Sequence, residues 1–225
     1  MDFSFIDRGF DKTLVVLPGW AFDHKIFPIR GLGYNIISPS SPLCGDVSTA
    51  LLKLILGKGL GEVDILGWSL GSVCAYLFAK EHQELVRNLF LISARNSYPK
   101  TMISELTSEI VKDKDAALKR FYLTSFYSQR EDYRWFRKLH MKRLLGLWST
   151  TKLIKGLNFL LQYPIKPYNF TDINLLIIHG AEDLVAPLSF VPSVTSKQKF
   201  KKFVLDSSGH VPFLNPSFHE IIENF

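Results

Sequence analysis

The sequence feature that most constrains the fold is a glycine-serine-glycine turn between a strand-like and a helix-like segment. Residues 67–71 read Gly-Trp-Ser-Leu-Gly; residues 63–66 before them are apolar, and the residues after them have a helical pattern. At a sharp strand-to-helix turn the serine backbone is strained. Gly67 and Gly71 are needed there because a Cβ at either position would collide with the neighbouring strand or helix. The hydroxyl of Ser69 then stands clear of the sheet at a helix N-terminus, where the dipole favours developing negative charge. Five-residue patterns of this kind also recur by chance, and it is the strand-turn-helix context that predicts a nucleophile elbow.

Two further polar side chains follow apolar strands, in the chain order Ser, Asp, His. Residues 175–180 read as a buried strand followed by Asp183, and residues 203–206 read as another strand followed by His210. In open α/β sheets, ligands bind at the carboxyl edge where both side chains would lie. Histidine suits the role of base because its ordinary pKa lies near neutrality. Asp183 would hold the other ring nitrogen and stabilise the imidazolium.

The assignment of the acid has an alternative, because Asp206 also ends a strand and precedes His210 by only four residues. Such a residue can cap a turn instead. The spacing favours Asp183, since an acid on the preceding strand end can face the imidazole from the side. The plain alternative for His210 is a solvated loop histidine. The other histidines are interpreted as ordinary structural, core or surface residues: His24, His82, His140, His179 and His219.

An oxyanion hole needs two backbone N–H donors, one from the residue after the nucleophile and one from an early strand-to-helix loop. Leu70 supplies the first. Residues 14–17 read as an apolar strand that runs into a Pro-Gly turn, so the N–H of Trp20 is the candidate for the second. The indole of Trp20 is also placed to form a wall of the substrate pocket. The alternative is a plain β-turn with a packing tryptophan.

These motifs resemble the α/β-hydrolase superfamily, and more narrowly the pimeloyl-acyl carrier protein methyl ester esterases of biotin synthesis. In that family a tryptophan follows the glycine of the oxyanion loop, as Trp20 does, and a tryptophan precedes the nucleophile, as Trp68 does. Residues 180–187 match the stretch that carries the acid, Gly-x-x-Asp-x-x-Val-Pro, in a similar form. Residues 210–213 match the His-x-Pro-Phe stretch. The resemblance covers the core of the chain.

The resemblance implies a serine carboxylesterase that hydrolyses the methyl ester of pimeloyl-acyl carrier protein without a cofactor, and Trp68 is a further candidate for the pocket wall. A general short-chain carboxylesterase, an acyl thioesterase and an elimination enzyme of menaquinone synthesis would use the same residues. The alternative that is not an enzyme is a ligand-binding relative in which the triad no longer turns over substrate. The residues carried over are the triad Ser69, Asp183 and His210 and the oxyanion donors Trp20 and Leu70.

The chain departs from the family pattern in three places. Pro18 stands where the oxyanion loop usually has histidine, and Ser72 stands where a glycine follows the elbow. Residues 36–43 replace the usual Asp-x-x-Gly-x-Gly stretch after the second strand. None of these changes removes a catalytic group.

Apolar strands alternate with helix-length segments, which predicts a mostly parallel sheet flanked by helices, the α/β-hydrolase fold. Residues 2–8 are a candidate for a hairpin with the first parallel strand. The alternation of strands and helices is interrupted over residues 98–170. This segment looks helical and is expected to form a cap over the active site. The core would then comprise residues 1–97 and 171–225, in one folding unit.

The expected cap is strongly basic. Residues 100–170 contain 14 lysines and arginines and six acidic residues, a net charge of +8, whereas the whole chain carries +6. Within this segment Trp135 and Leu139 are expected on another face of an amphipathic helix with a basic outer side. The basic positions that recur at helical spacing are Arg130, Arg134, Arg137, Lys138 and Lys142.

Such a field concentrates an anionic partner near the pocket mouth. The family resemblance suggests acidic acyl carrier protein as that partner, whereas the plain alternative is a solvated basic helix face. Nucleic acid is not expected, because no recognised binding motif accompanies the charge.

Length and composition agree with one enzyme domain. The chain has 225 residues, of which 47% are hydrophobic, and it can bury a single large core. We expect no signal peptide, no membrane span, no metal site, a cytoplasmic location and a monomer. Cys44 and Cys74 do not make a disulfide framework, and Cys74 is expected to be a small core residue.

Overall fold

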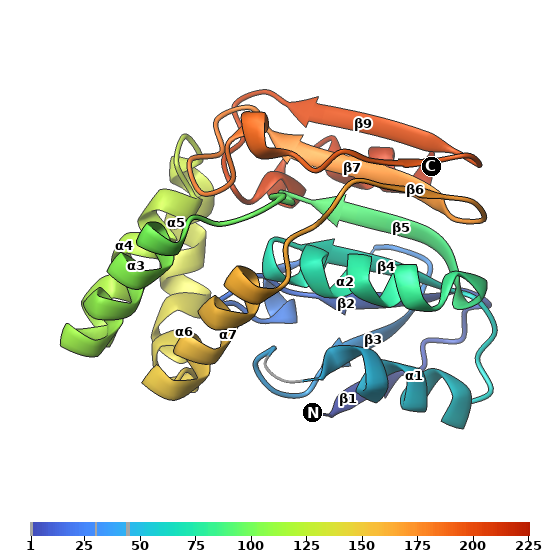
Figure 1. Cartoon of the computed structure of the whole chain (residues 1–225), viewed down its shortest axis with the longest axis horizontal. Coiled ribbons are helices and arrows are strands. Elements are labelled where there is room, and N and C mark those ends of the chain that lie inside the picture. Colours follow the sequence, from blue (N-terminus) through green and yellow to red (C-terminus); the bar gives the residue numbers. More distant parts are fainter. Residues whose placement is uncertain (1, 30, 44–45) are drawn as a thin grey trace.

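The computed structural model describes residues 2–29, 31–43 and 46–225, and within them a seven-stranded sheet forms the centre of the fold (Figure 1). The strand order is β1-β3-β2-β4-β5-β7-β9, with β1 antiparallel to its neighbour and the other strands parallel. The mostly parallel sheet predicted from the sequence is confirmed. The strands are β1 (Phe3–Ile6), β2 (Thr13–Leu17), β3 (Asn35–Pro39), β4 (Val63–Trp68), β5 (Val86–Ile92), β7 (Asn174–Gly180) and β9 (Phe200–Leu205).

The central strands are apolar on both faces because both faces are covered. Every residue of β2, β3 and β4 is buried, and β7 is buried from its second residue on. Such continuous apolar runs are typical of parallel strands between helices. At the edge of the sheet, β9 exposes most of its residues.

The N-terminal strand does not form the hairpin expected for residues 2–8. It pairs antiparallel with β3, with Phe3 opposite Pro39 and Ile6 opposite Ile36. The hydrogen-bonding edges of β2 are occupied by β3 and β4, so β2 offers no free edge to the N-terminal strand. The hairpin expectation was therefore wrong, although a strand is present.

The helices that connect the strands begin at identifiable caps. Helix α1 (Val47–Gly57) starts after Asp46, whose carboxylate accepts a hydrogen bond from the N–H of Thr49 at 3.0 Å. Helices α1 and α2 (Leu70–Glu81) pack against each other on one face of the sheet (Figure 1). The remaining elements of the core are α8 (Phe218–Glu223) and the short 3-10 helices η1 (His24–Ile26), η2 (Gln83–Leu85), η4 (Leu188–Phe190) and η5 (Pro212–Leu214).

An inserted helical region, residues 100–162, follows β5 and lies beyond the carboxyl ends of the parallel strands (Figure 1). Its elements are α3 (Lys100–Lys112), α4 (Lys114–Ser125), α5 (Arg130–Phe136), the π-helix η3 (Arg137–Met141), α6 (Lys142–Leu147) and α7 (Thr150–Gln162). The junction residues Arg137 and Lys142 have right-handed helical backbone angles, so α5, η3 and α6 run on as one helix with a π-turn in its middle. We call this continuous helix the α5–α6 helix.

The predicted helical segment, residues 98–170, is too long at its C-terminal end. The last helix ends at Gln162, and residues 168–170 form strand β6 (Tyr168–Phe170), which pairs with β8 (Val194–Ser196) in a separate two-stranded sheet. Pro164 and Pro167 precede this strand, and proline removes the backbone donor that a helix needs.

Among the described residues, no helix is both long enough and apolar enough to cross a membrane. Cys74 is a buried core residue, as expected, and burial raises the pKa of its thiol to about 12. Cys44 lies outside the described residues.

Candidate active site

Ser69 occupies the strained turn that the sequence predicts. Strand β4 ends at Trp68 and α2 begins at Leu70, and between them Ser69 has φ 55° and ψ −114°. A positive φ is rare for a residue with a side chain, and such strain is concentrated at functional positions. The N–H of Ser69 donates to the carbonyl oxygen of Ile92 at 2.9 Å, while its hydroxyl makes no capping hydrogen bond to α2. The backbone of Ser69 is thus fixed, and its hydroxyl is not used to cap the helix.

The two glycines of the turn leave no room for a Cβ. A Cβ on Gly67 would lie 2.4 Å from the carbonyl oxygen of Gly71, and one on Gly71 would lie 2.0 Å from the carbonyl oxygen of Leu17. The collision expected from the sequence is therefore present on both sides. Ser72 fits where the related family has glycine, because its hydroxyl donates to the carbonyl oxygens of Gly67 and Ile92 at 2.7 and 3.0 Å.

The structure brings Asp183 and His210 together. The Nδ1 atom of His210 lies 2.8 Å from Oδ2 of Asp183, and both side chains are buried. The other carboxylate oxygen of Asp183 accepts the N–H groups of Val185 and Ala186 at 2.9 and 2.8 Å. Burial alone would raise the pKa of this carboxyl, but the charge and hydrogen bond of His210 and the N–H of Ala186 hold the pKa below its ordinary value. Asp183 is therefore ionised at neutral pH and orients the imidazole.

The rival acid lies elsewhere. Asp206 is exposed in the turn after β9, and its backbone carbonyl oxygen accepts a hydrogen bond from the hydroxyl of Ser208. His179 lies in the core beneath the acid, with Nε2 3.5 Å from Oδ2 of Asp183, and burial lowers the pKa of its imidazole. His179 is structural, as expected, but its contact with the acid was not foreseen.

The second nitrogen of His210 faces away from Asp183 and is available for chemistry. This Nε2 atom is buried and has no hydrogen-bond partner among the described residues, so it is not bonded to Ser69. The indole N–H of Trp68 donates to the carbonyl oxygen of His210 at 2.7 Å, and the two rings lie 5.5 Å apart. Trp68, next to the nucleophile in sequence, thus supports the histidine loop.

The two candidate oxyanion donors flank Ser69. Leu70 is the first residue of α2, so its N–H has no acceptor within the helix. Trp20 lies in the turn after β2, next to β4 in the sheet, and this turn is closed by a hydrogen bond from Phe22 N–H to the carbonyl oxygen of Gly19 at 3.2 Å. The role of these two N–H groups as oxyanion donors stays a prediction from the sequence.

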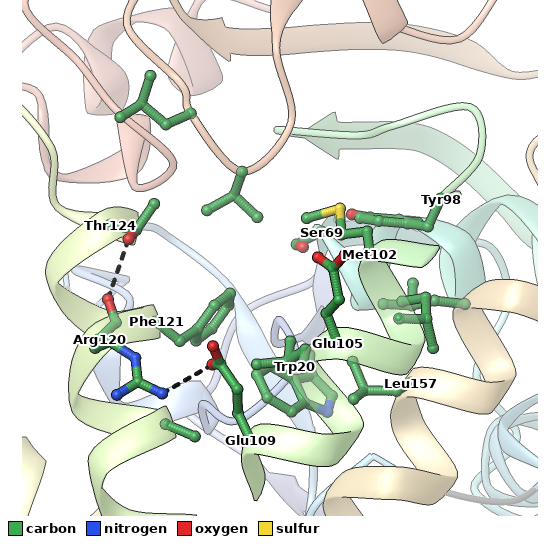
Figure 2. A pocket seen from close by; sticks show the side chains of 16 residues that line it. Trp20, Ser69, Tyr98, Met102, Glu105, Glu109, Arg120, Phe121, Thr124 and Leu157 are labelled. Atoms are coloured by element: carbon green, nitrogen blue, oxygen red, sulfur yellow. Dashed lines mark hydrogen bonds and ion pairs between the residues drawn. The ribbon is translucent and has the colours of Figure 1, made fainter. Parts of the chain in front are cut away.

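Ser69 opens into a cavity of about 330 Å³ between the core and the inserted helices α3, α4 and α7. Figure 2 shows Ser69 and Tyr98 at one side of this cavity and the ion pair between Glu109 and Arg120 at another. The lining is mainly apolar and includes the indole of Trp20, as expected from the sequence. An apolar cavity with a serine hydroxyl in its lining suits an acyl chain.

Trp68 is not part of this cavity, which corrects the expectation from the sequence. Its side chain is fully buried among Phe22, Phe27 and Phe213, and it is absent from the cavity lining. The residue sits on the last position of a central strand, where the side chain points into the core rather than toward the inserted helices.

Tyr98 lines the cavity, although no motif in the sequence singled it out. It lies after β5 and lines the cavity beside Ser69, with its ring 5.0 Å from the guanidinium of Arg95. Burial raises the pKa of its phenol to about 12, while hydrogen bonding with Ser69 acts in the opposite direction. Tyr98 is therefore a neutral hydroxyl next to the nucleophile.

The five basic candidates lie on the α5–α6 helix, and all five are exposed, but none lines the cavity. Phe136 and Leu144 form the buried side of this helix. Trp135 and Leu139 are 37% and 57% exposed, so they do not belong to the buried side of this helix. The basic side chains are Arg130, Arg134, Arg137, Lys138 and Lys142.

The profile of the alpha/beta hydrolase fold matches residues 26–216 of the chain, which is most of its length. The chain belongs to the α/β-hydrolase fold family. Within this family it is 25% identical to a pimeloyl-[acyl-carrier protein] methyl ester esterase of Aeromonas hydrophila subsp. hydrophila, over 96% of each chain. It is 21% identical to the protein of the same name from Wigglesworthia glossinidia brevipalpis, over 92% of this chain and 83% of that relative.

Solved structures of the α/β-hydrolase family share the fold at low sequence identity. An esterase from Exiguobacterium antarcticum aligns with a TM-score of 0.79 and 20% identity, covering 99% of this chain and 94% of its own. A thermophilic esterase aligns with a TM-score of 0.72 and 17% identity, covering 100% and 96%. The family resemblance stated from the motifs is thereby confirmed.

Proposed function

We propose that this α/β-hydrolase is a serine carboxylesterase in which Ser69 is the nucleophile, His210 the general base and Asp183 the orienting acid. The observations that carry this proposal are the buried contact between Asp183 and His210 at 2.8 Å and the strained backbone of Ser69, whose side chain lines an apolar cavity. The free Nε2 of His210 is the atom that would accept the serine proton once substrate brings the groups together.

The reaction follows from these roles. The Ser69 hydroxyl attacks the ester carbonyl while His210 takes its proton, and the tetrahedral oxyanion is held by the N–H groups of Trp20 and Leu70. His210 then returns the proton to the departing alcohol, and an acyl-enzyme remains. Water, activated by the same histidine, releases the acid and restores Ser69. Each oxyanion donor is worth roughly 3 kcal/mol of barrier.

Our proposed substrate is the methyl ester of a pimeloyl chain carried on acyl carrier protein, with methanol as the leaving group. Both reported relatives carry that activity in their names, and the mainly apolar lining of the cavity favours an acyl chain. The basic α5–α6 helix supports an acidic carrier as the partner. Arg134, Arg137 and Lys138 line one shallow surface hollow, which suits a carboxylate or phosphate group.

The hydrolase assignment is tested with a small neutral ester. We expect the parent protein to hydrolyse it and the Ser69→Ala variant to lose at least a thousandfold of kcat, with the fold retained by thermal unfolding. A parent protein that binds the ester and never turns it over would instead be a ligand-binding relative.

The carrier assignment needs matched substrates with the same acyl group, one on acyl carrier protein and one on a small thiol. Activity on the carrier-bound ester should fall as salt rises from about 50 to 500 mM, because the attraction is screened. Activity on the small ester should change little.

Charge reversal by Arg134→Glu with Arg137→Glu should raise KM for the carrier substrate alone, whereas equal responses of both substrates would remove the docking role. Cleavage of the carrier thioester in place of the methyl ester would identify a thioesterase.

A further inference from the structure

The turn after β2, residues 18–23, has a conformation that its own hydrogen bonds do not explain. Ala21 has φ 62°, in the left-handed region that residues with a side chain rarely adopt. Such a conformation persists only where the surrounding structure holds it. The turn carries the Trp20 N–H, so whatever holds the turn also sets the direction of that donor.

One contact that holds the turn comes from α4. The hydroxyl of Tyr122 donates to the carbonyl oxygen of Ala21 at 2.8 Å, and the contact is buried. The ring of Tyr122 is fully buried and lies 4.9 Å from that of Phe22 and 5.0 Å from that of Phe136. Burial raises the pKa of this phenol far above its ordinary value, so it remains a donor at every working pH.

Two other inserted helices hold the same turn. The indole Nε1 of Trp20 donates to the carbonyl oxygen of Leu153 on α7 at 2.9 Å. This approach depends on Gly156, where a Cβ would lie 2.8 Å from the indole ring. Arg143 on α6 forms a bidentate ion pair with Asp23, with 3.0 Å between Nη2 and Oδ1. Each of these three inserted helices thus holds one residue of the turn after β2 in place.

We propose that Tyr122 is a positioning residue of the oxyanion hole: its hydroxyl, held on an inserted helix, fixes the Ala21 peptide and thereby aims the N–H of Trp20 at the reacting carbonyl oxygen. This inference rests on the proposed function, since it assigns a role within the same site. An oxyanion donor acts only when it is fixed at hydrogen-bond distance before the charge develops. The inserted helices therefore complete the catalytic geometry as well as enclose the acyl chain.

The test is Tyr122→Phe, which keeps the ring and removes the hydroxyl. We expect kcat on a small neutral ester to fall about tenfold, with KM within about twofold of the parent, because the lost interaction matters most in the transition state. The affinity for a trifluoromethyl ketone should fall by the same factor as kcat. Ser69 adds to the carbonyl of that ketone, its proton passes to His210, and the resulting oxyanion sits in the hole.

The matched control is Tyr76→Phe. Tyr76 is also buried and donates its hydroxyl to a backbone carbonyl, that of Lys166, but it does not line the cavity. It should show a similar loss of thermal stability with unchanged kcat and ketone affinity. If Tyr122→Phe leaves both kcat and ketone affinity at the parent level, or raises KM alone, the positioning role is overturned.

A second variant keeps the inference testable if Tyr122→Phe does not fold. Arg143→Gln breaks the ion pair with Asp23 at a partly exposed position and should lower kcat and ketone affinity together, by about threefold. No change in either would contradict the inference. Hydrolysis that disappears in Ser69→Ala establishes the proposed function on its own. A parent-like Tyr122→Phe would then remove the positioning role alone, whereas an inactive parent would remove both.

Discussion

Replacing Asp183 by asparagine keeps the shape of the side chain but reverses the polarity of its contact with His210. In the parent, one carboxylate oxygen accepts the N–H groups of Val185 and Ala186, and the other faces Nδ1 of His210 at 2.8 Å. In the variant, the amide oxygen will keep the two backbone donors, so the NH₂ group must face the imidazole. An NH₂ group only donates, and Nδ1 then has to be an acceptor. The ring proton moves to Nε2, which can no longer act as a base.

The size of the effect follows from this wrong tautomer. A triad histidine held in the wrong tautomer loses about a thousandfold to ten-thousandfold in kcat, which is about 4 to 5.4 kcal/mol of barrier. KM should stay within about threefold, because Asp183 does not line the acyl cavity. The measurement is kcat and KM on a small neutral ester, with thermal unfolding to show that the variant folds.

Asp206→Asn is the matched control, since Asp206 is exposed. It should retain at least half of the parent kcat, as most exposed substitutions do. The reasoning is refuted if Asp183→Asn keeps more than about a tenth of parent kcat while folded, or if Asp206→Asn is the crippled variant.

Three other outcomes are expected. Gly71→Ala should destabilise the fold by about 3 kcal/mol or more in urea unfolding, since its Cβ would lie 2.0 Å from the Leu17 carbonyl oxygen; a loss below about 1 kcal/mol would show that the turn can relax. Trp68→Phe removes the donor to the His210 carbonyl and should cost about 2 kcal/mol of stability and lower kcat with KM unchanged, whereas a raised KM would return Trp68 to the substrate pocket. The folded-state pKa of Asp183 is lowered, so between it and the unfolded value of about 3.9 the unfolded chain binds more protons. The stability of the parent should therefore fall as the pH drops below about 4. The urea midpoint of Asp183→Asn should fall less steeply with decreasing pH than that of the parent. Equal slopes for the two proteins would argue that Asp183 does not contribute to the acid sensitivity.

The parts of the site that the sequence predicted are those set by neighbours a few residues away. Gly67 and Gly71 surround Ser69 because strand, turn and helix must meet within five residues, which leaves no room for a Cβ at either glycine. This steric demand is visible in the local sequence pattern. Asp183 and His210 could be expected close together because each follows an apolar strand, and parallel strands place their carboxyl ends at one edge. The choice of Asp183 over Asp206 rested on spacing, since an acid on the preceding strand end can face the imidazole from the side.

Other features depended on long-range packing and left no local signal. Trp68 follows the same motif as Ser69 in sequence, yet its ring turns into the core because it belongs to a central strand. Tyr98 and Tyr122 are ordinary tyrosines in the sequence. Only the packed structure places Tyr98 at the cavity and the hydroxyl of Tyr122 on the carbonyl oxygen of Ala21.

By itself, the sequence determined the strand-turn-helix that presents Ser69, the order of the three polar residues and the excess positive charge of the insertion, because steric demands, strand polarity and net charge are local or additive properties. The tertiary structure alone decided that His210 meets Asp183, that Nε2 of His210 has no hydrogen-bond partner within the described part of the chain, and that three inserted helices hold the turn after β2. Those contacts join segments far apart in the chain, and their geometry is fixed only when the whole core and insertion have packed together.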